Sequence, residues 1–156
     1  MSDFKIEFTN NAKVIKRAIA DAQKTWLVQS AEILRDAVRD LTRVKTGKTK
    51  RSFNYYLQSK GDDLEAKVGS PDENAIWEEF GTGEYALEGN GRKGGWVYTN
   101  EKGEKVFTYG KTPSRALYYA CKSVEGALKA GFKEVFGGVF KLSLIHISEP
   151  TRPLYI

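Results

Sequence analysis

Residues 11–43 read NAKVIKRAIADAQKTWLVQSAEILRDAVRDLTR, and this stretch decides the fold. Its apolar residues recur at steps of three and four, which is the spacing of one face of an α-helix. No glycine or proline interrupts the stretch, and Asn10 or Asn11 precedes it as a candidate N-cap. We therefore predict one long amphipathic helix over residues 11–43. Its apolar face comprises Ile15, Ile19, Ala22, Trp26, Ile33, Ala37 and Leu41.

Alternating apolar residues on both sides of this helix predict strands. Residues 4–8 place Phe and Ile between charged residues, which predicts a short strand before the helix. Gly47 is expected to end the helical pattern through a left-handed turn that leads into the next strand. Residues 53–57 and 64–68 both alternate, and the turn-rich residues 59–63 join them, so an antiparallel hairpin is predicted here.

The second half of the chain continues with short elements. Pro71 is typical of a helix start and predicts a short helix that carries Ile76 and Phe80. Residues 81–95 hold six glycines and are interpreted as a flexible loop. A second hairpin is predicted from residues 96–98 and 106–108.

Pro113 fits the first turn of a final helix, for which Thr112 or Ser114 is the candidate cap and Gly137-Gly138 the expected end. Cys121 lies on its apolar face and is interpreted as a small core residue. The whole order predicts an α+β fold: one antiparallel sheet packed on one face by the long N-terminal helix and the C-terminal helix, with a long Gly-rich loop or hairpin.

Composition bounds the class of protein. The chain has 156 residues, 40% of them apolar and 29% charged, which suits a single globular domain of modest core. No apolar run approaches the roughly 20 residues of a membrane span, so no membrane partner is expected. The single cysteine forms no intramolecular disulfide, which favours a reducing, intracellular site of synthesis. The net charge of +5 suits DNA or an acidic protein ring as a partner.

The last residues are interpreted as foreign to the domain. Leu142 to Arg152 reads LSLIHISEPTR, which resembles the conceptual translation of a transposase adapter used to prepare sequencing libraries. We expect a domain over residues 1–140 and a non-native tail over residues 141–156. A natural extended tail is the alternative. The expected tail holds the only histidine of the chain, His146.

Motifs for nucleotide, metal or catalytic chemistry fail on their context. Residues 89–94 spell G-x-G-x-x-G but precede a predicted strand, whereas a dinucleotide site opens a helix. Gly47-Lys48-Thr49 copies the end of a P-loop without its first glycine or its preceding strand. The carboxylates of Glu78, Glu79 and Glu84 are interpreted as structural, since nothing supplies an apolar pocket to shift a pKa. We expect no enzyme activity, cofactor or metal.

Three ordered blocks carry a resemblance to a known family. The first, 44–52, has a V-x-T-G turn and a later serine, the second, 77–83, reads WEEFGTG, and the third, 113–117, is a proline-led helix entry. Together they resemble the gene-product-ten-like family of tailed-phage neck or minor tail components, over roughly residues 10–137. Lys48 and Thr49 depart from the family pattern, and the third block matches its part of that pattern less closely than the other two. The matching residues are Val44, Thr46, Gly47, Ser52, Trp77, Glu79, Phe80, Gly81, Thr82, Gly83, Pro113, Arg115, Ala116 and Leu117.

The resemblance implies a structural virion protein of a tailed phage or prophage. Such a protein acts in head–tail joining or tail completion as a ring-like homo-oligomer, with neighbouring neck and tail proteins as partners. It would reside in the virion, and in the host cytoplasm during assembly. The segment from Gly81 to Lys111 exceeds a normal connection, and we expect it to contact a neighbour. The candidate interface residues are Tyr85, Arg92, Trp96 and Tyr98, unless these side chains simply pack on the parent sheet.

The basic residues after the long helix support a second function class. They could contact DNA non-specifically in the channel of a ring, or form an ordinary solvated surface. Alternatively, they could join the aromatic residues 53–56 in a small nucleic-acid-binding module, where stacking and phosphate contacts combine. The candidate DNA-facing residues are Lys45, Lys48, Lys50 and Arg51.

Overall fold

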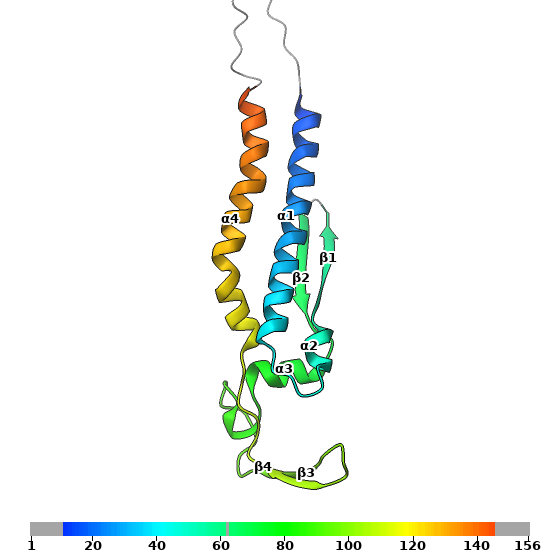
Figure 1. Ribbon diagram of the computed structural model, residues 1–156, viewed down its shortest axis with the longest axis vertical. Coiled ribbons are helices and arrows are strands. Elements are labelled where there is room, and N and C mark those ends of the chain that lie inside the picture. The colour runs from blue at the N-terminus through cyan, green and yellow to red at the C-terminus, as the bar shows by residue number, and fades with distance from the viewer. Residues whose placement is uncertain (1–10, 62, 146–156) are drawn as a thin grey trace, which may run out of the picture.

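A computed structural model describes residues 11–61 and 63–145 of the chain (Figure 1). Two long antiparallel helices, α1 (Ala12–Leu41) and α4 (Ala116–Ile145), lie side by side and make the fold elongated. The predicted long helix is confirmed, although Asn11 caps α1 without a side-chain hydrogen bond. The strand predicted over residues 4–8 lies outside the described residues.

Aromatic and small residues hold the two long helices together. The Trp26 ring of α1 meets the Phe132 ring of α4 edge-on at 5.4 Å, and its Nε1–H donates to the Leu128 carbonyl over 3.3 Å. Nearer the other end of the pair, Val38 and Ala120 are fully buried. Burial of apolar surface between α1 and α4 is therefore the main stabilising term of this half of the molecule.

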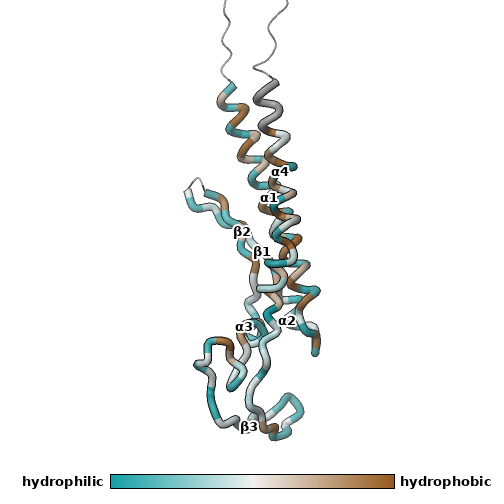
Figure 2. Tube along the Cα trace, turned by 90° about the vertical axis from the view of Figure 1, so that its left-hand side faces the viewer, coloured by the Kyte–Doolittle hydropathy of each residue, from teal (hydrophilic) through white to brown (hydrophobic). Residues whose placement is uncertain are grey.

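The first hairpin is confirmed as an antiparallel pair, β1 (Asn54–Lys60) and β2 (Asp63–Gly69). Tyr55 pairs with Val68 and Leu57 pairs with Ala66, so these apolar side chains share one face. That face is half-buried against α1, whereas the intervening residues are exposed. Figure 2 shows that the hairpin stands apart from the long helices toward its tip.

The connection between α1 and β1 corrects one prediction. Gly47 does adopt the left-handed conformation, with φ of 74°, but a short helix, α2 (Lys48–Ser52), follows it instead of a strand. The reason is tertiary, because the hydroxyls of Thr49 and Ser52 bond to the segment that precedes the next helix. These bonds hold a polar five-residue turn that has no apolar periodicity of its own.

The next helix, α3 (Glu73–Phe80), confirms the short helix predicted after Pro71. Asp72 caps it by accepting the Asn74 N–H on its side chain, the usual role of Asp at this position. A 3-10 turn, η1 (Gly83–Tyr85), follows at once. The flexibility predicted for residues 81–95 is not confirmed.

The strands form two separate sheets, so the prediction of one sheet under two helices is wrong. β3 (Trp96–Thr99) and β4 (Lys105–Thr108) pair with each other and not with β1 or β2. The chain turns away after α3. The second hairpin forms at the opposite end of the molecule from the start of α1 and the end of α4 (Figure 1). The fold is still α+β, but α4 packs on α1 instead of on a sheet.

The bounds of α4 differ from the prediction at both ends. The helix begins at Ala116, after Pro113 and Ser114, and it passes through Gly137 and Gly138 to Ile145. Each glycine lowers the stability of the helix by about 1 kcal/mol relative to alanine. This loss is too small to end a helix that packs along α1. The boundary expected at residue 140 stays a prediction. No helix in the described ranges is long and apolar enough to cross a membrane.

Candidate functional site

Two of the predicted motif blocks meet where α3 approaches the start of α4. The backbone N–H of Ser114 donates to the Glu78 carbonyl over 2.6 Å, and its hydroxyl donates to the same oxygen over 3.0 Å. The start of the connection that follows α1 joins them, since the Arg43 guanidinium donates to the Thr112 carbonyl over 3.1 Å. We call this region the junction: residues 43–52, 70–83 and 109–118.

Glu79 caps α4 across the junction. Its carboxylate accepts the backbone N–H of Leu117 over 2.8 Å and that of Tyr118 over 3.0 Å. A helix N-terminus has free N–H groups and a partial positive charge, so a carboxylate is a strong partner there. Arg115 takes a positive φ of 55° at this entry, and its guanidinium lies 3.9 Å from the Tyr118 ring centroid. The sequence carries no local signal for this long-range cap.

A polar network closes the junction around Thr49. The Thr49 hydroxyl donates to Asp72 over 2.8 Å and accepts from the Asn74 amide over 2.9 Å. The bond from Thr49 is the main cause of a lowered Asp72 pKa. Lys111 contacts the Asn74 oxygen and pairs with the buried Glu78 carboxylate.

These side chains line a polar cavity of about 400 Å³. One oxygen of Glu78 pairs with Lys111, and the other is buried with no partner among the described residues. The Glu78 carboxylate, held by Lys111 among amide and hydroxyl groups, is suited to fixing two distant segments of the chain to each other. Within the part of the chain that the structure describes, no cluster of three histidine, cysteine or acidic side chains could hold a metal ion.

The Gly-Thr-Gly turn fastens the second hairpin to the junction. The Thr82 N–H donates to the Lys111 carbonyl, and the Lys111 N–H donates to the Thr82 hydroxyl, both over 2.9 Å. Gly81 has φ of 74°, and a Cβ atom there would lie 2.8 Å from the Tyr85 carbonyl oxygen. Gly83 is equally constrained, since a Cβ atom would overlap the Tyr109 carbonyl. Close backbone approach therefore explains both glycines.

The predicted interface residues divide into two kinds. Tyr85 and Tyr98 are about half exposed, as an interface role requires. Trp96 is only partly exposed, and the Arg92 guanidinium lies 5.7 Å from its ring centroid, so these two side chains contact each other. Their role at an interface stays a prediction.

Further exposed aromatics were not anticipated from the sequence. Phe107 and Tyr109 are 54% and 49% exposed and meet edge-on at 5.1 Å, with Val97 directly across the hairpin from Phe107. Tyr109 directly follows β4, two positions after Phe107, and this spacing is the signal that places both rings on one side. The sequence gives no sign that this face lacks a covering layer.

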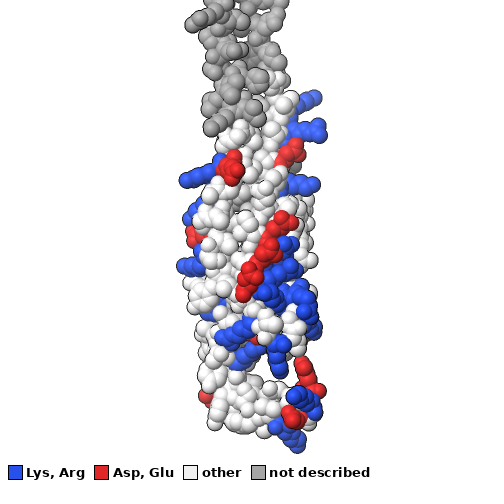
Figure 3. Space-filling model, in the orientation of Figure 1, with Lys and Arg blue, Asp and Glu red and all other residues white. Residues whose placement is uncertain are grey.

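The candidate DNA-facing residues lie on and beside α2. Lys and Arg gather over this region below a diagonal run of acidic side chains (Figure 3). Lys50 lies 3.7 Å from Asp40 and Lys48 lies 3.9 Å from Asp72, so both have acidic partners. These surface pairs weaken the case for phosphate binding by those two lysines.

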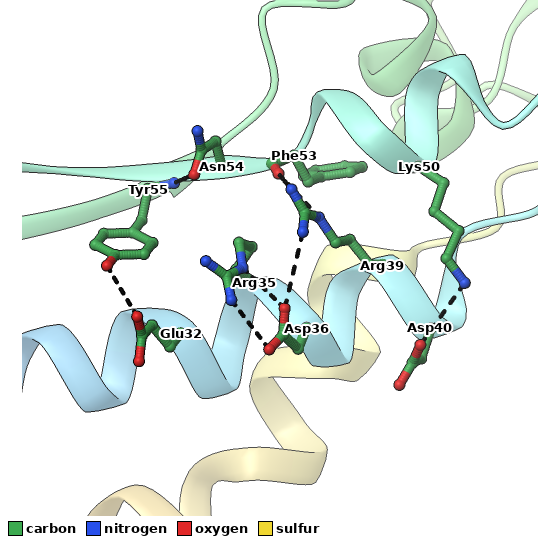
Figure 4. A network of polar contacts seen from close by, with 9 residues as sticks. All are labelled: Glu32, Arg35, Asp36, Arg39, Asp40, Lys50, Phe53, Asn54 and Tyr55. Carbon is green, nitrogen blue, oxygen red and sulfur yellow. Dashed lines mark hydrogen bonds and ion pairs between the residues drawn. The ribbon is translucent and has the colours of Figure 1, made fainter.

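A second polar network braces α1 against β1 (Figure 4). Arg39 donates twice to the Phe53 carbonyl, over 2.6 and 3.1 Å, where the chain enters β1. The Tyr55 hydroxyl donates to Glu32 over 3.1 Å, and this bond to a carboxylate raises the pKa of Tyr55. The hairpin is thereby fixed to the same helix that packs on α4.

The predicted core role of Cys121 is wrong, because this residue is exposed. Ala120, one position earlier, takes the fully buried place beside Val38. Partial burial, followed by the charge of Glu79, raises the pKa of the Cys121 thiol. This shift reduces the thiolate fraction and hence nucleophilicity at neutral pH.

Residues 6–81 match the family model described as bacteriophage HK97-gp10, putative tail-component. This stretch, nearly half of the chain, is similar to the HK97-gp10-like family. The match includes the blocks over residues 44–52 and 77–81, and thus α1, both strands of the first hairpin and α3. The third block, residues 113–117, lies beyond the match, so its family role stays a prediction. No curated protein and no solved structure matches the chain.

This similarity supports a phage tail component of the structural kind. The junction supplies a physical reason for the motif residues in the matched part. Ser52 and Glu79 tie segments together, through bonds to Ser70 and to the start of α4, and Gly81 permits the close approach of two backbones. The assignment of each residue to a family role remains a prediction.

Proposed function

We propose that this HK97-gp10-like chain is a structural virion protein that acts in head–tail joining or tail completion. The observation that carries the proposal is the family match over residues 6–81. A structural role is also consistent with the junction, where Glu78 pairs with Lys111 and Glu79 caps the N-terminus of α4. In this role the protein performs no catalysis and needs no cofactor.

The protein acts as a ring-like homo-oligomer that contacts neighbouring neck and tail proteins. Exposed aromatic side chains support this proposal, because aromatics are the usual anchors of interfaces. The segment from Gly81 to Lys111 carries Tyr85, Tyr98, Phe107 and Tyr109 in exposed positions, and Tyr85 and Tyr98 are the candidates for contact with a neighbour. A ring places different surfaces of adjacent copies in contact and closes by rotation.

The protein is made in the host cytoplasm and resides in the virion. Immunogold labelling of purified particles, with an antibody against this chain, tests that location. Label where the head meets the tail supports joining, and label at a tail terminus supports completion. Particles that carry no label above the level of a non-structural phage protein would contradict both.

A non-specific contact with DNA in the channel would use the basic residues on and beside α2. Lys45 and Arg51 are exposed, and Arg51 bonds only weakly, over 3.4 Å, to the Thr46 carbonyl. The rival function, a nucleic-acid-binding module, would use the same residues with Tyr56, which is 59% exposed. A gel shift with duplex and single-stranded DNA across a salt series separates the two. A neck protein should bind little at physiological salt, whereas a binding module should retain affinity and lose it with Lys45→Glu.

A further inference from the structure

The second hairpin exposes an apolar face that nothing in the described chain covers. Val97 and Phe107 lie on one side of β3 and β4, and the ring of Tyr109, which directly follows β4, packs edge-on against Phe107. The three side chains are 58%, 54% and 49% exposed. Gly95 makes room for this face, since a Cβ atom there would lie 2.5 Å from the Phe107 ring. An isolated two-stranded hairpin is marginal in water, so this face is expected to gain stability from a covering layer. We call these three side chains the hairpin face.

A second uncovered apolar surface lies elsewhere, between α3 and the first turns of α4. It is a groove of about 460 Å³, and Phe53 and Ala75 of the core form its floor. Its apolar rim is well exposed, in contrast to that floor. The rim comprises Ile76, Phe80, Leu87 and Tyr118, which are 60%, 49%, 48% and 40% exposed.

The hairpin cannot fold back into the groove of its own chain. Its base is fastened by the paired bonds between Thr82 and Lys111 and by the Glu84 N–H, which donates to the Tyr109 carbonyl over 2.9 Å. From that base the two strands lie beyond α3 and the start of α4, at the end of the molecule (Figure 1). The two surfaces can therefore meet only between molecules.

We propose that the hairpin face of one copy inserts into the α3–α4 groove of a second copy. This inference rests on the proposed function and specifies the contact between adjacent subunits. Every copy carries both surfaces at different places, so the contact is heterologous and continues from copy to copy. The groove floor consists of buried core residues, Phe53 and Ala75, which gives an inserted aromatic ring an apolar environment.

The area involved favours a closed assembly over a dimer. At the exposed fractions above, the hairpin face offers on the order of 300 Å² and the groove rim on the order of 400 Å². The sum is below the roughly 1,200 Å² of a stable pairwise interface. A single contact is therefore weak and forms a dimer only at high concentration, whereas a ring, in which every copy makes two such contacts, persists at lower concentration.

Paired charge insertions test the contact. Phe107→Lys breaks the hairpin face, and Ile76→Lys breaks the groove, while Val14→Lys places the same charge at a 68% exposed site on α1. Sedimentation velocity over a range of concentrations should show assembly of the wild type and of Val14→Lys, and monomers for the other two. Circular dichroism checks the fold of each variant. Val97→Lys and Leu87→Lys replace any variant that fails to fold.

Mixing the two broken variants gives the decisive readout. Phe107→Lys keeps an intact groove and Ile76→Lys keeps an intact hairpin, so the mixture can form one contact per pair. We expect a 1:1 complex at high concentration and no larger species. A mixture that stays monomeric, wild-type assembly by both variants, or a wild type that never assembles would overturn the proposal.

Infection separates this inference from the proposed function. Both variants should fail to rescue a phage that lacks this gene, whereas Val14→Lys should rescue it. Rescue by both broken variants would remove the hairpin contact and leave the joining role intact. Normal virions in the complete absence of the gene would instead remove the joining role.

Discussion

The Glu79 carboxylate of α3 accepts the backbone N–H of Leu117 over 2.8 Å, so the N-terminus of α4 is held by a side chain from another helix. A charged acceptor at a helix N-terminus stabilises by about 1–2 kcal/mol. Glu79→Ala should lower the free energy of unfolding by about that amount, and Glu79→Gln by less, because an acceptor remains. Urea denaturation measures both.

Glu134→Ala on the exposed side of α4 is the control, and we expect a change within about 0.5 kcal/mol. Equal losses for Glu79→Ala and Glu134→Ala would show that the cap contributes nothing.

The close approach at Gly81 leads to a second prediction. A Cβ atom there would meet the Tyr85 and Lys111 carbonyls at 2.8 and 2.9 Å, in addition to the strain of φ 74°. Gly81→Ala should destabilise the protein by roughly 2–4 kcal/mol. Gly61 has a similar φ of 64° but no atom near its Cβ position, so Gly61→Ala should cost only about 1 kcal/mol. Thermal unfolding of the two variants compares them, and equal midpoints would refute the steric part of the explanation.

Acid should weaken the network at the start of α3. The pKa of Asp72 is lowered, chiefly by the Thr49 hydroxyl and then by the Asn74 N–H and Lys48. The stability that this carboxylate contributes is therefore fully present above its pKa in the unfolded chain, about 3.9. It is lost as the pH falls through the lower pKa of Asp72 in the folded protein. Urea midpoints should fall more steeply below about pH 4 for the wild type than for Asp72→Asn.

Asp40→Asn serves as the control for this acid experiment, because the Asp40 side chain is 82% exposed and its ion pair among the described residues, with Lys50 at 3.7 Å, is a surface one. Parallel acid curves for the wild type and Asp72→Asn would contradict the prediction.

The aromatic contact between the long helices supplies a fourth prediction. Trp26 meets both Phe132 and Phe136 edge-on, and its indole N–H bonds to α4. Trp26→Ala should cost about 2–3 kcal/mol, since the ring is only partly buried. Trp77, which is 49% exposed on α3, is the matched residue, and Trp77→Ala should cost well under half as much. Chemical denaturation with far-UV detection gives both values.

Local patterns predicted the elements, and long-range contacts decided what the patterns left out. The apolar period of α1 and the alternation of β1 and β2 are local, and both elements formed as predicted. α2 was missed because Lys48–Ser52 has no apolar period and depends on hydroxyl bonds to Asp72 and Ser70. The separation of the two hairpins was missed because pairing between strands distant in sequence leaves no local signal.

The candidate site was foreseen in part for the same reason. Gly81 and Gly83 stood out as turn residues, and the structure explains them by carbonyl groups that approach from Tyr109 and Lys111. The cap that Glu79 places on Leu117 joins residues with no fixed spacing. The alternation of residues around Phe107 predicted a strand with two faces. The exposure of the face that carries Phe107 was not predictable, because it depends on the absence of a neighbouring layer in the described chain.

The most direct test of the central claim is electron microscopy of lysates from the parent phage or induced prophage with a stop codon at Trp26. The account predicts filled heads separated from free tails, or tails of abnormal length if the protein completes the tail. Expression of the intact gene in trans should restore joined particles. Intact virions from the stop mutant would contradict the account and leave nucleic-acid binding as the leading function.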